Sequence, residues 1–376
     1  MTEPIIIVGA GISGLRAASL LIENGVECIV LEARDRVGGR VLSKGIEDHP
    51  EFGRFDLGPT WFWPQAEPAI KSLVRELQLI TFEQQTKGAV LFEQSSEKQT
   101  VRHILPDGSI EPSCRIVGGV ESLIEALSKK IPADLIQLST RVDKIIKEQN
   151  GMLKVFFTFP DGHVQQLQTE TVILAVPPRL VTERIKFKPP FSGGVMSRLS
   201  SQPTWMAGHA KALAVYEQPF WRSEGLSGQA VSRVGPLQEI HDASPEMGGG
   251  ALFGFLGMPP KVRHELGEKQ ILELVIEQLT KLYGPAAANP IGLLYKDWST
   301  DSETAVEKDS TPLDSFPEYG PLENLDEWGD SILFSSTETS AYQGGHMEGA
   351  LRSAEKVVNQ VLSKRITRNS GRRENE

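Results

Sequence analysis

The sequence predicts an α/β fold in which a discontinuous domain with a parallel sheet carries an inserted α+β domain. Two observations lead to this prediction. A run of branched apolar residues, Ile5–Val8, is followed by glycines, a helical repeat that ends at Gly25, and a second apolar run, Cys28–Leu31. This order is a βαβ unit, whose crossover is parallel and right-handed. Between about residues 201 and 300 the alternation of strands and helices is lost, which indicates a second domain.

Several local elements follow the first unit. The pattern predicts a short amphipathic helix over Ile70–Leu77 and another helix over Val120–Leu127. Alternation across Arg141–Thr158 predicts two antiparallel strands that meet at Asn150-Gly151, a dipeptide typical of tight hairpins. A buried strand is expected over Thr171–Val176, where an uninterrupted apolar run precedes two prolines.

The later part of the chain mixes strands with a few helices. Strands are expected over Ala212–Tyr216, Ala251–Leu256 and Ile291–Tyr295, around a helix over Lys269–Leu282. After a short strand, Ile332–Phe334, a final helix presents one apolar face, formed by Met347, Leu351, Ala354, Val358, Val361 and Leu362. We therefore expect one domain from residues 1–63, 114–200 and 305–364, a second from 64–113 and 201–304, and a basic disordered tail over 365–376.

Composition restricts the class of protein. The 376 residues carry a net charge of −10, which argues against a nucleic-acid partner. A nucleic-acid or membrane arm is the alternative interpretation of the basic tail. Cys28 and Cys114 are the two cysteines, too few for a disulfide framework. No apolar run approaches the roughly 20 residues that span a bilayer, and no signal peptide precedes Ile5. These features predict a soluble cytoplasmic protein. We expect it to be a monomer or a homodimer.

The glycines after the first strand have the spacing Gly9-x-Gly11-x-x-Gly14. Gly9 permits a tight turn, Gly11 allows backbone amides to approach a pyrophosphate, and Gly14 allows the helix to pack closely on the strand. Glu32 ends the second strand, where a carboxylate accepts hydrogen bonds from ribose hydroxyls. The glycine spacing alone also fits an ordinary loop. The complete unit predicts a dinucleotide site.

The next residues indicate which dinucleotide binds. The segment from Glu32 to Arg40 contains a second glycine pair, Gly38-Gly39, followed by arginine. The pair provides another close approach of the backbone, and Arg40 provides a cation for the pyrophosphate. Arg34 and Arg40 could instead be two solvated surface charges, but that interpretation does not explain the glycines between them. We expect FAD.

With these motifs the chain resembles the flavin-containing amine oxidase family, the monoamine oxidase and polyamine oxidase group. The resemblance covers nearly the whole chain. Besides the two glycine motifs it rests on Phe55-Asp56-Leu57-Gly58, Val117-Gly118-Gly119, Ala175-Val176-Pro177-Pro178, Lys211, Pro219-Phe220-Trp221, Trp298, Thr337-Glu338 and Gly345-His346-Met347-Glu348-Gly349-Ala350. It implies a discontinuous Rossmann-like FAD-binding domain of the GR2 type and an inserted substrate domain.

The resemblance also assigns residues to the cofactor. In the family a helix that begins near Gly345 directs its amides at the pyrimidine edge of the flavin, and the Met347 amide would stabilise the reduced ring. Glu338 resembles the acid that holds the ribityl chain, or is a surface acid, and Val142 resembles the residue whose backbone meets adenine. The expected FAD contacts are Gly9, Gly11, Ile12, Ser13, Gly14, Glu32, Ala33, Arg34, Gly38, Gly39, Arg40, Gly58, Pro59, Thr60, Val142, Glu338, Gly345, His346 and Met347.

Three residues are candidates for catalysis. Lys211 lies within an apolar strand, and a buried lysine is costly unless it has a purpose. It resembles the family lysine that holds a water near flavin N5 and assists reoxidation, although a lysine at a strand edge is the alternative. Trp298 resembles the tryptophan beside the flavin, or is a core aromatic residue. His346 is the third candidate. Trp61 and Trp63 are expected to line the substrate pocket, or to plug the contact between domains.

The sequence departs from the family pattern in three places. Residues 299–312 contain no cysteine, which excludes the covalent flavin attachment found there in monoamine oxidases. His346 occupies the position of one tyrosine of the usual aromatic cage, and a gapless count from Trp298 puts Lys308 at the other. A lysine there would repel a substrate ammonium. Trp61 replaces the arginine by which amino-acid oxidases of this fold bind a carboxylate.

The prediction is an FAD-dependent amine oxidase. A C–H bond next to nitrogen would deliver a hydride equivalent to flavin N5, and O2 would reoxidise the flavin with release of H2O2. FAD would be held non-covalently, and no metal is expected. Two alternatives remain at this stage. One is an FAD-dependent desaturase or dehydrogenase that acts on an apolar substrate; the other is a flavin-binding protein with a degraded active site.

Overall fold

The computed structural model describes residues 3–106, 108–311, 313, 315–322 and 324–373. One sheet has the strand order β20-β13-β1-β2-β9, and its neighbouring strands are all parallel. It consists of β1 (Ile5–Val8), β2 (Cys28–Leu31), β9 (Ile136–Gln137), β13 (Val172–Leu174) and β20 (Ile332–Phe334). The predicted βαβ unit is confirmed, and segments far apart in sequence complete the sheet around it.

Successive side chains of β1 are buried on opposite faces of this sheet, as the period of a strand requires. Ile5 and Ile7 belong to a core shared with helices α1 (Ile12–Glu23), α3 (Glu121–Ser128) and α8 (Met347–Arg373). Ile6 and Val8 belong to a second core on the other face. The strand is therefore apolar throughout because both of its faces are covered.

The second core is covered by a smaller sheet with the order β12-β11-β10-β14 and by two helices. The antiparallel pairing of β10 with β11 confirms the predicted hairpin. The elements of this layer are β10 (Arg141–Lys147), β11 (Leu153–Thr158), β12 (Val164–Thr169), β14 (Lys186–Lys188), α4 (Pro178–Arg184) and α5 (Gly193–Ser201).

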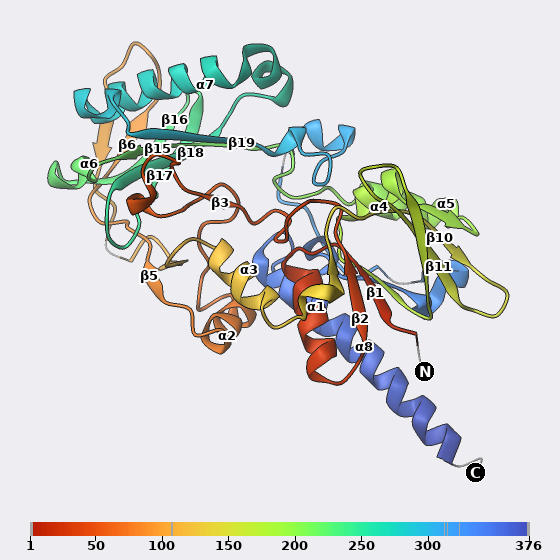
Figure 1. The fold of residues 1–376 in the computed structure, drawn as a ribbon. Helices are drawn as coiled ribbons and strands as arrows, with labels where there is room; N and C mark the ends of the chain where they lie inside the picture. The colour runs from red at the N-terminus through yellow and green to blue at the C-terminus, as the bar shows by residue number, and fades with distance from the viewer. Residues whose placement is uncertain (1–2, 107, 312, 314, 323, 374–376) are drawn as a thin grey trace.

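A seven-stranded sheet with the order β19-β15-β18-β17-β16-β6-β7 forms the other end of the molecule (Figure 1). Helix α7 (Pro260–Tyr283) lies along one face of this sheet, and the short helix α6 (Phe220–Ser223) packs with it. The strands are β6 (Ala89–Glu93), β7 (Val101–His103), β15 (Ala210–Tyr216), β16 (Leu226–Ser232), β17 (Leu237–Asp242), β18 (Gly250–Leu256) and β19 (Gly292–Asp297).

Strand β15 is completely buried, and its alternation separates two environments. Ala210, Ala212 and Ala214 belong to the core beneath α7. Leu213 and Val215 face the opposite way, into a core that includes Phe55 from the N-terminal part of the chain. Lys211 has the same parity as Leu213, so strand geometry directs its side chain toward the N-terminal part.

Short elements connect the two ends of the molecule. The predicted helices over 70–77 and 120–127 are present with boundaries shifted by one or two residues, as α2 and α3. The connecting elements are α2 (Pro68–Glu76), β3 (Ser43–Lys44), β4 (Phe55–Asp56), β5 (Thr81–Glu83) and β8 (Cys114–Ile116). Single 3-10 turns occur at Pro50–Phe52, Ala133–Leu135, Pro285–Ala288, Trp298–Thr300, Glu307–Ser310, Asp326–Ser331 and Thr337–Thr339.

The expectation of a disordered tail over 365–376 is wrong for residues 365–373, because α8 continues to Arg373 and extends away from the body of the protein (Figure 1). Near the start of this segment Lys364 anchors the helix, because its Nζ lies 3.0 Å from the Asp330 carbonyl oxygen and 3.2 Å from the Asp330 carboxylate. Residues 374–376 lie outside the described part of the chain.

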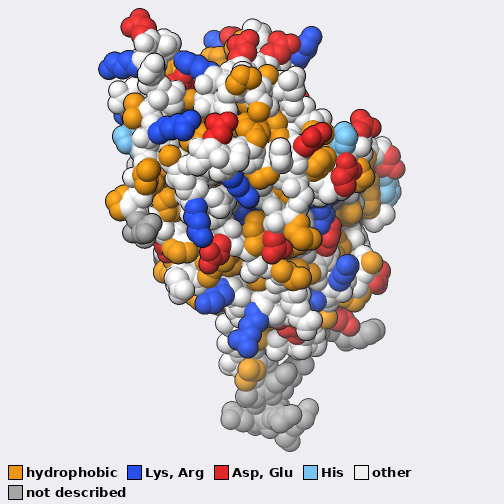
Figure 2. Space-filling model, turned by 90° about the vertical axis from the view of Figure 1, so that its left-hand side faces the viewer, with side chains coloured by type: hydrophobic (Ala, Val, Ile, Leu, Met, Phe, Trp, Pro, Cys, Tyr) orange, Lys and Arg blue, Asp and Glu red, His pale blue; other side chains and the backbone are white. Residues whose placement is uncertain are grey.

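Further features of the described residues concern membrane-spanning helices, metal-binding clusters and the distribution of surface charge. None of their helices has the length and apolar character needed to cross a bilayer. Within the same residues, no group of three or more His, Cys, Asp or Glu side chains is placed to hold a metal ion. On the face shown in Figure 2, acidic and basic side chains are interspersed rather than separated by sign.

The contact between α1 and β1 depends on Gly14. A Cβ atom at this position would lie 1.9 Å from the carbonyl oxygen of Gly9. We expect Gly14→Ala to force the helix away from the strand and to lower the free energy of unfolding by about 1–3 kcal/mol, as overpacking does. Chemical denaturation of the cofactor-free protein measures this effect.

Gly11→Ala is the matched control, because a Cβ on Gly11 meets no atom within 4 Å. We expect this change to cost less than about 1 kcal/mol, as exchanges of glycine and alanine at a helix N-cap do. Equal destabilisation by the two substitutions would contradict the packing role of Gly14.

Candidate active site and cofactor cavity

One long cavity runs between the parallel sheet and the seven-stranded sheet, and its walls come from both. Its glycine-rich end is formed by the loop between β1 and α1. Gly9 has a φ of +101° and begins the turn, and Gly11 is the N-cap of α1. No side chain caps this helix, so its first amides are available to a ligand.

A second loop completes this end. Gly38 and Gly39 have φ values of +101° and +59°, and Gly38 forms an isolated bridge with Gly11. A Cβ on Gly39 would lie 3.3 Å from the Cα atom of Gly11, so a side chain would separate the two loops. The glycine spacing thus produces two stacked backbone turns next to a free helix N-terminus, which is a suitable cradle for a pyrophosphate.

Glu32 is positioned by the backbone at the end of β2. It is 4% exposed, Oε2 accepts the Ala10 amide at 2.6 Å, and Oε1 accepts the Arg34 amide at 2.9 Å. Each carboxylate oxygen has a further lone pair, so Glu32 can still accept hydrogen bonds from two ribose hydroxyls. The Arg34 guanidinium binds Asp301 at 2.6 Å and so braces the segment after β19.

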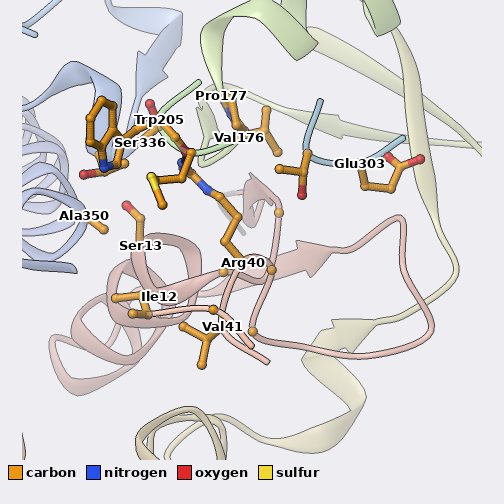
Figure 3. A pocket seen from close by; sticks show the side chains of 18 of the residues that line it. Ile12, Ser13, Arg40, Val41, Val176, Pro177, Trp205, Glu303, Ser336 and Ala350 are labelled. Atoms are coloured by element: carbon orange, nitrogen blue, oxygen red, sulfur yellow. Dashed lines mark hydrogen bonds between the residues drawn. The ribbon is translucent and has the colours of Figure 1, made fainter. Parts of the chain in front are cut away.

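Arg40 crosses the middle of the cavity, as Figure 3 shows. Its guanidinium donates to both carboxylate oxygens of Glu338, at 2.7 and 3.2 Å. Glu338 is fully buried behind Arg40 and is not part of the cavity wall. The sequence placed both residues at the cofactor. In the structure Arg40 lines the cavity, and Glu338 fixes the orientation of Arg40.

The other predicted cofactor residues divide in a similar way. Gly14 supports the wall from behind, through its contact with Gly9. The remaining residues line the cavity directly, and they are Ile12, Ser13, Ala33, Gly58, Pro59, Thr60, Val142, Gly345, His346 and Met347. Met347 begins α8, and the acid in its first turn, Glu348, binds the amides of Ala69 and Ile70 in α2 instead.

Lys211 lies at the opposite end and is 2% exposed. Its Nζ donates to the carbonyl oxygens of Asp56 and Gly58 at 2.8 and 3.0 Å and to Thr60 Oγ1 at 2.6 Å. The ammonium also lies 4.0 Å from the centre of the Phe253 ring. Burial lowers the pKa of Lys211 from 10.5 to about 7, and the Asp56 carboxylate opposes this effect.

Trp298 lines the cavity and contacts the segment that also binds Lys211. The indole nitrogen donates to the Leu57 carbonyl at 3.0 Å, and Lys296 Nζ lies 4.7 Å from the centre of its ring. His209 lines the cavity nearby, and its Nδ1 is buried with no hydrogen-bond partner in the described part of the chain. Burial lowers the pKa of His209, and Arg263 adds to the shift.

Aromatic rings form the walls near Lys211. Trp61 packs against Phe253, with ring centres 5.6 Å apart, and lies edge-on to Trp63. Phe62 between them faces the other way, into the core with α1. Trp63 stacks on His346 at 5.7 Å between ring centres and 26° between planes. The predicted pocket residues Trp61 and Trp63 therefore both lie on the cavity wall, and Trp63 contacts His346.

Glu67 is the most important wall residue that the sequence did not predict. It is 2% exposed, Oε2 accepts the Trp63 amide at 2.7 Å, and Oε1 lies 2.8 Å from His346 Nδ1. In the sequence it precedes a proline at the start of a helix, so it resembles an ordinary surface acid. Other wall residues without a sequence signal are Arg141, Arg184, Trp205, Met206, His209, Phe255, Glu303 and Thr304.

The gapless count that placed Lys308 beside His346 is wrong. Lys308 is outside the cavity, where its Nζ donates to Ser200 Oγ. The chain after Trp298 coils into two 3-10 turns, and the buried Asp309 carboxylate binds Arg179 at 2.6 Å. This anchoring turns Lys308 outward, so it contributes no charge to the cavity wall.

The residues of the cavity fit a dinucleotide with a large ring system. The glycine loops, the helix N-terminus and Glu32 suit a pyrophosphate and a ribose, and the unpaired His209 Nδ1 and the amides of α8 remain for the ring at the far end. The flat walls formed by Trp61, Trp63 and Trp298 suit an aromatic body.

Comparisons with known proteins agree with this geometry. The sequence pattern of the flavin containing amine oxidoreductase family matches residues 87–362, and that of NAD(P)-binding Rossmann-like domains matches residues 7–77. Putrescine oxidase of Kocuria rosea is 24% identical, over 95% of this chain and 95% of that protein. The flavin-containing amine oxidase B of Sus scrofa is 22% identical, over 95% and 86%.

Solved structures show the same fold. A putrescine oxidase with putrescine bound has a TM-score of 0.77 and 22% identity, and the match covers 96% of this chain and 99% of that one. Cyclohexylamine oxidase of Brevibacterium oxydans has a TM-score of 0.77 at 17% identity, over 97% and 99%. The chain belongs to the flavin containing amine oxidoreductase family, and is an FAD-dependent oxidoreductase that acts on amines.

Proposed function

We propose that this enzyme oxidises a primary monoamine with an apolar or aromatic body, and that O2 is its electron acceptor. Bound FAD would supply the redox chemistry, which is transfer of a hydride equivalent from the C–H beside nitrogen and of the electrons to O2, with H2O2 and an imine that hydrolyses as products. The observation that carries the proposal is the position of an aromatic wall next to a single buried carboxylate, Glu67.

The three carboxylates of the described cavity wall, Glu32, Glu67 and Glu303, have different partners. Glu32 holds two backbone amides at the ribose end, and Glu303 forms an ion pair with Arg141. Glu67 is the remaining acidic side chain on the described part of the wall, and the aromatic rings are near it. One carboxylate can attract one ammonium, whereas a diamine would require a second acidic group. This arrangement supports a monoamine.

We assign the other wall residues by position. The α1 amides and Gly38-Gly39 would hold the pyrophosphate, Glu32 the ribose, and Val142 the adenine. The Met347 amide would face the pyrimidine edge of the flavin, and Trp298 would pack beside the ring. Trp61 and Trp63 would contact the body of the substrate. We also propose that the chain forms two domains with the boundaries expected from the sequence. The protein would be a cytoplasmic monomer or homodimer, and its two cysteines are free.

The substrate class is tested by a peroxide screen. We expect benzylamine to give H2O2 in air at least roughly tenfold faster, at equal low concentration, than putrescine or an α-amino acid, because the aromatic wall buries its ring and Glu67 attracts its ammonium. Preference for putrescine would contradict the monoamine assignment. Flavin that bleaches with amine under anaerobic conditions but yields no H2O2 in air would indicate a dehydrogenase.

Non-covalent binding of FAD has a direct test. The two cysteines of the chain, Cys28 and Cys114, lie outside the cavity wall, so the wall offers no thiol for a thioether bond to the flavin. We expect acid precipitation of the yellow holoenzyme to release essentially all FAD into the supernatant. Flavin that remains in the pellet after washing would disprove the assignment.

Lys211 has a proposed role in the reaction with O2, because its ammonium is buried at the flavin end of the cavity. We expect Lys211→Met to retain FAD but to slow the reoxidation of the dithionite-reduced enzyme in air. Stopped-flow absorbance of the flavin measures the rate. A rate equal to that of the wild type would remove Lys211 from this step.

The same substitution has an expected effect on stability. The folded-state pKa of Lys211 is about 7 and its ordinary value is 10.5, so between these pH values the unfolded chain binds a proton that the folded protein does not. Its contribution to the free energy of unfolding therefore rises with pH in this window, by up to about 1.4 kcal/mol per pH unit. Lys211→Met should lose this slope, and the control Lys269→Met, at a 93% exposed side chain, should keep it.

A further inference from the structure

His346 and Glu67 form a pair that is oriented from several sides. Glu67 is fixed because Oε2 accepts the amide of Trp63 and Oε1 faces His346 Nδ1 at 2.8 Å. The imidazole stacks on Trp63, and Phe316 lies edge-on to it at 6.0 Å. The carbonyl of His346 accepts a hydrogen bond from Thr337 Oγ1 at 2.7 Å. Both the backbone and the ring of His346 are therefore held in place.

This geometry determines the tautomer of the neutral ring. A carboxylate accepts hydrogen bonds and does not donate them, so Nδ1 must carry the proton that is shared with Glu67. Nε2 then has a free lone pair. No hydrogen bond joins Nε2 to the described residues, although the side chain lines the cavity and is 29% exposed. The wall thus contains an oriented, unused proton acceptor.

An amine substrate requires such a group. A primary amine is mainly an ammonium ion at neutral pH, and an ammonium nitrogen has no lone pair to support removal of a hydride from the adjacent carbon. Lys211 is unsuited to accept the proton, because its Nζ is fully engaged with Asp56, Gly58 and Thr60. The His346 side chain, next to Trp63, is on the wall that we assign to the substrate.

We propose that His346 Nε2 accepts the proton of the substrate ammonium, and that Glu67 is the positioning residue that makes this possible. The inference rests on the proposed function and adds a catalytic residue to it. An N–H bond of the ammonium breaks, its electron pair stays on the substrate nitrogen, and the proton bonds to Nε2. The resulting imidazolium is stabilised by the Glu67 carboxylate. Partial exposure of the ring lets the proton pass to solvent afterwards.

The charged groups around His346 are consistent with this role. Glu67 faces it from the segment before α2. Glu348, on the same helix, is occupied by the α2 amides and by Arg352 at 2.7 Å. Arg40, which also lines the cavity, is paired with Glu338. Glu67 is thus the one carboxylate bonded to the imidazole in the described structure.

The test compares two variants with the wild type across a pH series, and benzylamine is the probe. In Glu67→Gln the amide donates to Nδ1, which moves the ring proton to Nε2 and removes the acceptor. His346→Phe keeps a flat ring on Trp63 but has no acceptor. We expect kcat/KM to fall roughly 100-fold at neutral pH in both variants.

The dependence of this loss on pH separates proton transfer from packing. As the pH rises through the pKa of free benzylamine, the solution itself supplies neutral amine, and the loss should shrink toward zero in both variants. A loss that is the same at every pH would overturn the proposal and leave Glu67 and His346 a structural role. Unchanged kcat/KM would overturn it as well. FAD content is measured for each variant to confirm that the site is intact.

Glu51→Gln is the matched control. Glu51 binds Nδ1 of His49 at 3.1 Å in the same type of pair, but at the surface, and neither residue lines the cavity. This variant should retain the wild-type pH profile.

A second readout does not depend on turnover. Isotope-labelled histidine reports the protonated nitrogen of each ring by NMR, and His346→Phe identifies the signal of His346. We expect the proton on Nδ1 in the wild type and on Nε2 in Glu67→Gln. The same tautomer in both proteins would overturn the proposal. Absence of peroxide from every amine, together with the expected tautomer switch, would refute the proposed function but leave the oriented acceptor established.

Discussion

The site depends on the contact between Lys211 and the segment from Asp56 to Thr60. Lys211 belongs to the seven-stranded sheet, whereas its three acceptors belong to the chain that leaves the parallel sheet. Trp298 makes a second bond to the same segment, through the Leu57 carbonyl. The Asp56 carboxylate binds the Val120 amide at 2.8 Å on the opposite side. A stretch of irregular backbone is thus satisfied by side chains from two layers, as buried backbone requires.

This contact joins the architecture to the chemistry. A buried lysine is tolerated because carbonyl oxygens replace its water. One of these carbonyls belongs to Gly58, which lines the cavity, so the same contact shapes the cavity wall. In the middle of the cavity, Arg40 is held in the same manner by the buried Glu338. Both cations are therefore fixed by partners behind the wall. A fixed cation costs little reorganisation when charge develops near it, which is the condition for electrostatic catalysis.

The sequence predicted the features that arise from neighbouring residues. The loop from Gly9 to Gly14, the acid Glu32 and the pair Gly38-Gly39 act through the backbone over a few residues, so their spacing is sufficient. A lone lysine within the apolar run Ala210–Tyr216 likewise singled out Lys211 as a residue with a special environment. Glu67 was missed because its partner His346 is 279 positions away, and only the packing of α2 against α8 brings them together. Lys308 was placed wrongly because a gapless count of residues from Trp298 does not allow for the two 3-10 turns in this segment.

The contact between Glu67 and His346 explains how a histidine can serve where the family pattern leads us to expect a tyrosine. Considered alone, a histidine in an aromatic cage suggests a weakened site. With Glu67 behind it, the same ring has one nitrogen assigned as donor and the other left as acceptor, while Trp63 preserves the flat surface of the wall. Lys211 lies among Phe253 and Phe255, and burial lowers its pKa toward neutrality, which reduces its repulsion of an incoming ammonium. The replacement at His346 is thus compensated: the wall lacks the phenol of a tyrosine there but has an oriented imidazole with the Glu67 carboxylate behind it.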